Sequence, residues 1–151
     1  MKLIKIITLV LVSLTSLAMD EIHVVNPTIK ILPPGSTMTS ISMNIMNHSK
    51  KDIKLLGATG EFAKTFELHS MEMSNGMMKM RKVDQIEIKK DSSVELKSGG
   101  YHVMVFGLKS PLKEDQVVNL KLLFDDNKEV TVDVKAKSQM SSDNSGHGHH
   151  H

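Results

Sequence analysis

The chain has 151 residues, with 19 lysines and arginines, 17 acidic residues, no cysteine and no tryptophan, and its formal net charge at pH 7 is +2. This balance gives no argument for a nucleic-acid or membrane-surface partner, and the lack of cysteine excludes disulfides and thiolate metal ligands. Methionine occurs 12 times, whereas aromatic residues are 3% of the chain. The methionines are either flexible core fillers in place of aromatic residues or soft metal ligands.

The first 18 residues have the pattern of a cleaved secretory signal peptide. Lys2 and Lys5 precede an apolar run over 6–17, and cleavage is expected near Ala18 or Met19. The alternative is a membrane anchor, but a span needs roughly 20 apolar residues. No cysteine follows the run, so we expect no lipid-anchored lipoprotein. Removing 1–18 removes two lysines and no acid, which leaves 17 basic and 17 acidic residues in a periplasmic protein.

Short alternating apolar segments separated by turn signals predict β-strands throughout residues 19–136. In chain order these segments are 41–45, 53–59, 66–74, 77–80, 86–88, 94–96, 101–108, 118–124 and 130–134. No segment has helical periodicity. Many short strands with frequent turns are typical of a single antiparallel β-sandwich or barrel.

The last segment, residues 137–151, is polar and rich in histidine. It lacks the apolar residues needed to bury a face, so we expect it to be disordered. Its histidines are His147, His149, His150 and His151. An expression tag is the alternative, but such tags usually have six consecutive histidines and this chain retains its leader. We favour a native tail.

The dipeptide Asn75-Gly76 predicts a two-residue hairpin turn. The resulting register pairs, on one face, Met71 with Met80 and Met73 with Met78, and on the other face Glu72 with Lys79. The opposite charges of Glu72 and Lys79 support this register. Side chains two residues apart share a face of a strand, so His69 joins these methionines. The hairpin therefore gathers one imidazole and several thioethers on one patch.

A second strand carries a His-x-Met pair. His102 and Met104 share one face of the segment 101–107, while Val103 and Val105 point toward the core. Laid beside His69 and Met80, this pair completes four ligands. Thioether sulfur is soft and imidazole is borderline, so the set suits Cu(I), whereas zinc sites more usually include cysteine or carboxylate. A methionine stripe on a strand is more often core than ligand; two His-x-Met pairs in an exported chain without cysteine favour the metal site.

The spacing of these residues resembles the signature of the PCuAC family (DUF461) of periplasmic copper chaperones. Ten residues separate His69 from Met80, 21 separate Met80 from His102, and one separates His102 from Met104. Met71 matches the family's optional methionine. The resemblance implies a cupredoxin-like antiparallel β-sandwich of Greek-key type. It also implies a Cu(I) site at these four residues and a Met/His-rich tail proposed to bind Cu(II), to which the four tail histidines correspond loosely.

The resemblance further implies delivery of Cu(I) to the binuclear copper centre of cytochrome c oxidase subunit II, directly or through another assembly chaperone. We therefore expect a monomeric binding protein and not an enzyme. A copper-buffering or resistance protein with no dedicated client is the alternative. An electron-transfer copper protein is disfavoured, because its site normally needs a cysteine thiolate. We expect His23 and His48, which lie outside the motif, to be surface or structural residues.

Overall fold

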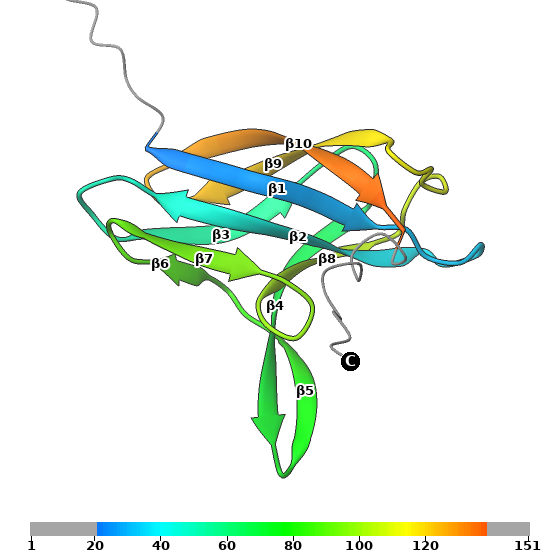
Figure 1. Cartoon of the computed structure of the whole chain (residues 1–151), viewed down its shortest axis with the longest axis horizontal. Coiled ribbons are helices and arrows are strands. Elements are labelled where there is room, and N and C mark those ends of the chain that lie inside the picture. The colour runs from blue at the N-terminus through cyan, green and yellow to red at the C-terminus, as the bar shows by residue number, and fades with distance from the viewer. Residues whose placement is uncertain (1–20, 139–151) are drawn as a thin grey trace, which may run out of the picture.

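The computed structural model describes residues 21–138, which form ten β-strands and contain no helix (Figure 1). The strands are β1 (Ile22–Lys30), β2 (Met38–Asn47), β3 (Ile53–Thr59), β4 (Thr65–Ser74), β5 (Met77–Lys82), β6 (Ile86–Ile88), β7 (Ser92–Leu96), β8 (His102–Phe106), β9 (Val117–Phe124) and β10 (Glu129–Lys137). A membrane-spanning helix is absent from this part of the chain. The expected signal peptide, the tail histidines and the expected disorder of the tail after Ser138 lie outside the described residues, whereas Lys137 ends β10.

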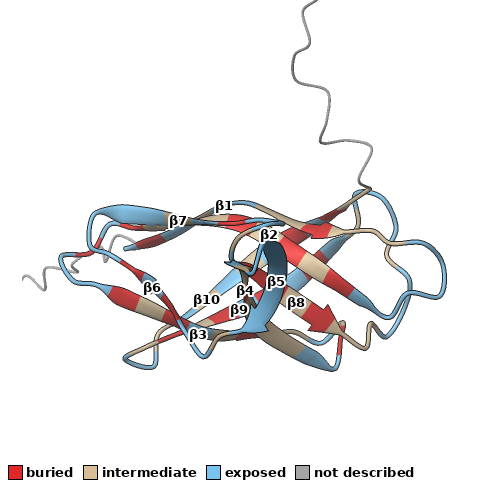
Figure 2. Cartoon of the chain, turned by 90° about the horizontal axis from the view of Figure 1, so that it is seen from below, coloured by how far each residue is buried: buried red, intermediate tan, exposed pale blue. Residues whose placement is uncertain are grey.

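The strands form one hydrogen-bonded path in the order β5-β4-β8-β2-β1-β10-β9-β3-β6, and β7 pairs with β2 beyond the end of β8. The path curls over, so that β3 packs against β4 and β6 lies beside β7 although neither pair shares a ladder. Figure 2 shows the two layers that result. Strands distant in sequence lie side by side, as Greek-key connections require. The predicted all-β sandwich is confirmed.

The core consists mainly of isoleucine, leucine and valine on the inward faces of the strands. On β2 the inward residues are Ile41, Met43 and Ile45, which alternate with half-buried polar neighbours as predicted. Met43 is the one methionine of residues 21–138 that is buried in the core. The methionines of the described chain therefore do not, as a group, replace aromatic core residues.

The strand β1 was not predicted, and its sequence explains why. Asn26 has a positive φ of 51°, and the register between β1 and β2 shifts between Val25 and Thr28. This bulge contains Pro27, which has no N–H for a ladder, and it breaks the two-residue alternation. Beyond the bulge β1 also pairs in parallel with β10, the one departure from antiparallel pairing among the named strands.

The segment from β4 to β5 projects from the body as a two-stranded ribbon (Figure 1). Within β4, pairing with β8 covers Thr65–His69, and beyond His69 the strand pairs with β5 alone. Asn75 and Gly76 have positive φ values of 51° and 75°, which is the conformation of a type I′ turn. The pairs of Met71 with Met80 and Met73 with Met78 confirm the predicted register.

Candidate functional site

The two histidines of the predicted site are direct cross-strand partners. His69 on β4 lies opposite His102 on β8, and the centroids of their rings are 5.9 Å apart. Met104 lies two residues beyond His102 on the same face, opposite Glu67. The pairing of β4 with β8, 33 positions apart at these histidines, brings together residues that are distant in sequence.

The predicted ligand Met80 lies on the other side of β4 from His102. Its direct partner is Met71, and the partner of His69 on β5 is Lys82. Two strand spacings, about 9–10 Å, separate the backbones of β5 and β8. Met71 stands between them on β4, and Met80 is 49% exposed at the base of the ribbon. The fold thus puts Met71 more centrally than Met80 on the face shared by His69 and His102.

A carboxylate orients His69. The Nε2–H of His69 donates to Oε2 of Glu67 over 2.9 Å, and Nζ of Lys82 donates to the other oxygen over 3.1 Å. These hydrogen bonds, with that from His69 the larger cause, lower the pKa of Glu67. A carboxylate only accepts hydrogen bonds, so Nε2 carries the proton and Nδ1 carries the lone pair. That Nδ1 is buried and has no hydrogen-bond partner.

A backbone carbonyl orients His102. The ring is buried, and its Nδ1–H donates to the oxygen of Gly100 over 3.0 Å. A carbonyl oxygen cannot donate, so Nε2 carries the lone pair. Each imidazole therefore has one nitrogen fixed by a protein acceptor and the other with a lone pair available. This arrangement is usual for histidines that bind metals, because the outer hydrogen bond sets the tautomer and ring direction.

The ring separation fits a shared metal ion. A metal–nitrogen bond of about 2.0–2.1 Å puts the ion about 3.1–3.2 Å from the ring centroid, so two rings bound at angles of about 110° to 140° have centroids about 5.2–5.9 Å apart. The observed 5.9 Å lies at the wide end of this range. No cluster of three or more histidine, cysteine or acidic residues suited to a metal occurs within residues 21–138. The Glu67 carboxylate is already hydrogen-bonded to His69 and Lys82. The remaining potential ligands on this face are thioethers, which favour a soft ion.

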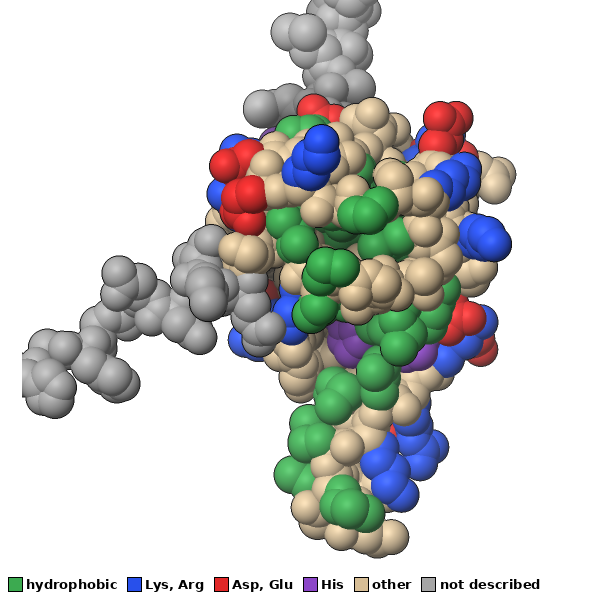
Figure 3. Space-filling model, turned by 90° about the vertical axis from the view of Figure 1, so that its right-hand side faces the viewer, with side chains coloured by type: hydrophobic (Ala, Val, Ile, Leu, Met, Phe, Trp, Pro, Cys, Tyr) green, Lys and Arg blue, Asp and Glu red, His purple; other side chains and the backbone are tan. Residues whose placement is uncertain are grey.

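The ribbon has two chemically different faces, and Figure 3 shows both. One face carries methionines that continue from the histidines at its base. The other face carries two basic side chains, whereas that of Lys82, the partner of His69, is on the methionine face. Met73, Met77 and Met78 are all exposed, at 68%, 61% and 48%. Met73 and Met78 share the face of Met71 and Met80, whereas Met77 is on the opposite face. Sulfur is therefore displayed to solvent beside the site.

Glu67 was not predicted as part of this site. It lies two residues before His69 on the same strand, so the period-two rule places it on the same face. That rule, applied to Glu67-x-His69, would have indicated a carboxylate partner for the imidazole. His23 and His48, expected to be surface or structural residues, are both exposed.

Comparison with solved structures defines the class of the fold. The copper-bound PCuAC domain of PmoF2 matches with a TM-score of 0.67 at 19% identity, over 78% of this chain and 93% of that domain. The solution structure of Cu(I)-DR1885 from Deinococcus radiodurans matches with a TM-score of 0.67 at 30% identity, over 83% of each chain. Its apo form matches with a TM-score of 0.64 at 28% identity, over 93% and 94%. The protein is a PCuAC-type, cupredoxin-like β-sandwich, which confirms the resemblance found in the sequence.

The chain belongs to the family described as "Putative lipoprotein LpqE-like", whose model matches residues 22–136. A curated protein of Leifsonia xyli subsp. xyli, also described as a "Putative lipoprotein", is 32% identical over 104 residues. That match covers 68% of this chain and 63% of the relative. The chain therefore spans less than two thirds of the relative's length.

Proposed function

We propose that this protein is a periplasmic copper chaperone that binds Cu(I) through His69, Met80, His102 and Met104, with Met71 as a further ligand. The observation that carries the proposal is the pair of adjacent imidazoles, each with one nitrogen held by a protein acceptor and the other available. Thioethers lie on the same face as this pair, on the three neighbouring strands β4, β5 and β8. Copper is the cargo of the protein, and the site performs no chemistry on it beyond binding and release.

The structure of the ribbon supports transfer in preference to permanent storage. Met80 is half exposed, and the ribbon beyond His69 is paired on one side only. A ribbon held in this way can bend to bring Met80 toward the histidines and can move away when a partner's ligands approach. Neutral sulfur ligands also leave the ion exchangeable, because they contribute no charge attraction.

The relatives support copper as the cargo. DR1885 has a solved Cu(I) form and the PmoF2 domain has a solved copper-bound form. The family's description as lipoproteins supports export to the cell envelope. We propose a periplasmic monomer whose signal peptide is residues 1–18. The proposed receiver is cytochrome c oxidase subunit II or another assembly chaperone, and the proposed role is not enzymatic.

The test is the loss of Cu(I) binding when one strand's ligands are removed. The double variant H102A/M104A should lose tight Cu(I) binding in a competition titration with a Cu(I)-specific chelator. M77A is a matched control, because Met77 is an exposed methionine of the same ribbon that faces the other way. Circular dichroism would establish that both variants are folded. An affinity for the double variant equal to that of M77A would disprove the assignment.

The exposed methionines favour one alternative function, copper buffering without a dedicated client. Met73 and Met78 lie outside the four-ligand set and still face the same side of the ribbon. The two functions differ in their effect on cells from which the gene has been deleted. Lost oxidase activity at low copper that added copper restores would support delivery, whereas sensitivity confined to high copper would support buffering.

A further inference from the structure

A second cluster of histidine and methionine lies on β1 and β2, away from the ribbon. His23 on β1 is the direct cross-strand partner of Met46 on β2, so the two side chains share a face. His48 follows Met46 by two residues, and its ring centroid is 5.1 Å from that of His23. Two imidazoles and one thioether therefore converge on one patch at the end of these strands.

We infer that His23, Met46 and His48 form a second Cu(I) site, separate from the one on β4, β5 and β8. The ring separation of 5.1 Å matches the value of about 5.2 Å expected for two imidazoles bound to one ion at a tetrahedral angle. The rings meet at 77° and both side chains are exposed, so the ring nitrogens are accessible to an incoming ion. A thioether beside two imidazoles selects a soft ion over hard cations.

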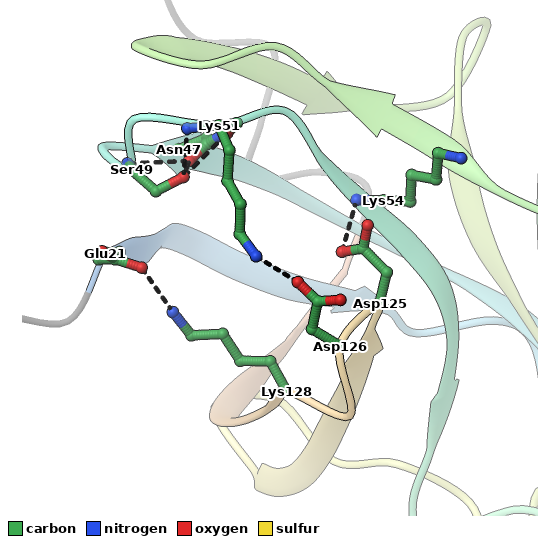
Figure 4. A network of polar contacts seen from close by, with 8 residues as sticks. All are labelled: Glu21, Asn47, Ser49, Lys51, Lys54, Asp125, Asp126 and Lys128. Atoms are coloured by element: carbon green, nitrogen blue, oxygen red, sulfur yellow. Dashed lines mark hydrogen bonds and ion pairs between the residues drawn. The ribbon is translucent and has the colours of Figure 1, made fainter.

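The loop that carries His48 is fixed by buried polar residues on both sides (Figure 4). The Asn47 side-chain amide donates to the carbonyl oxygens of Lys51, Ile88 and Lys89, and its Oδ1 accepts from the N–H and hydroxyl of Ser49. The His48 N–H donates to the oxygen of Glu21 over 2.7 Å. The backbone on either side of His48 is therefore held in place before any ligand arrives, which reduces the ordering cost of binding.

Two lysines around this cluster are paired with acidic side chains. Lys51 is paired with Asp126, and Lys128 is paired with Glu21 over 3.3 Å (Figure 4). Both lysines thus have acidic partners.

The cluster lies far from the first site. Met104 is opposite Ser40 on β2, and Met46 is six residues further along that strand, about 20 Å away. One ion cannot be shared between the two sites, so each should bind its own.

The test resolves the sites individually in the full chain from Met19 onward, as export would leave it. Cu(I) is added anaerobically to protein with ¹³C-labelled methionine methyl groups and ¹⁵N-labelled histidines, and NMR follows each resonance. We expect the Met46 methyl and the His23 and His48 rings to shift together and saturate at one bound ion. This response should persist in H102A/M104A, so that failure of the first site would not hide it.

The variant H23Q/H48Q should lose one equivalent of bound Cu(I) and abolish the shift of the Met46 methyl, while the His69 and His102 rings still respond. The control H149Q/H150Q removes two tail histidines and should leave the Met46 shift unchanged. The inference is overturned if the Met46 methyl does not move through three equivalents, or if its shift survives in H23Q/H48Q. A response of these histidines to Zn²⁺ without any response to Cu(I) would also overturn it.

Discussion

The hydrogen bond from His69 to Glu67 gives the sharpest single-residue prediction. In the variant E67Q the side chain keeps its size but loses the negative charge, and its amide end can donate as well as accept. The proton of His69 would then be held less firmly on Nε2, and the lone pair on Nδ1 would be less available. Binding of Cu(I) at His69 should weaken, although no proposed ligand has been changed.

The burial of the pair sets the size of the effect. The two side chains are 13% and 24% exposed, and the hydrogen bond is 2.9 Å long. The carboxylate therefore holds a ring that is largely shielded from solvent. Removal of the partner that orients a metal-binding histidine typically lowers affinity about 10–100-fold. We expect the loss in E67Q to fall within that range.

The assay is a competition titration of wild type and E67Q against a chromophoric Cu(I) chelator, with urea unfolding to compare stability. E72Q is the matched control, because Glu72 is on the opposite face of β4 from His69, pairs with Lys79, and is exposed. E72Q should bind as wild type does. Affinity in E67Q within twofold of E72Q, in a folded protein, would refute the proposed role of Glu67 or of His69.

Three further predictions concern the scaffold. In G76A a side chain must adopt a φ of 75°, which costs about 1–2 kcal/mol; the ribbon should loosen and Cu(I) affinity should fall, while the thermal unfolding midpoint of the body changes little. In N47A the buried hydrogen-bond partners of Asn47 are left unpaired, which should lower the free energy of unfolding by about 2–4 kcal/mol in urea titrations. A loss of less than about 0.5 kcal/mol would contradict the network's role. The fold lowers the pKa values of Asp52 and Asp126. The largest cause for Asp52 is a hydrogen bond from the backbone N–H of Lys90, and for Asp126 it is a hydrogen bond from the side chain of Lys51. The stability that these two carboxylates contribute is present above their unfolded pKa of about 3.9 and is lost as pH falls through their lower folded pKa. The urea midpoint should therefore be steady from about pH 7 to 5 and fall below about pH 4.

The hairpin was predicted to the residue because its determinants are local. Asn75-Gly76 dictates the turn, and that turn fixes every pair along the ribbon. Strand β1 was missed because the bulge at Asn26 and Pro27 breaks the alternation on which the prediction depended. Its parallel pairing with β10 joins the two ends of the domain, and nothing in local sequence carries that information.

The same distinction applies to the candidate sites. The grouping of His69 with the ribbon methionines followed from local pairing, whereas its contact with His102 depends on the pairing of β4 with β8. Resemblance to a known family supplied that step in the sequence. The cluster of His23 and Met46 was missed for a related reason: without β1, nothing indicated what lies opposite Met46.

The position of β5 at the edge of the sheet has a consequence for solubility. An edge strand offers unpaired N–H and C=O groups to any other chain, and exposed apolar side chains beside them promote aggregation. Yet Lys79, Arg81 and Lys82 place three positive charges among the six residues of β5, all of them exposed. Two copies approaching edge to edge would bring these charges together, so repulsion opposes fibre-like pairing. Repulsion thus opposes pairing of this sulfur-displaying strand with a second copy of itself, and salt, which screens the charges, weakens that protection.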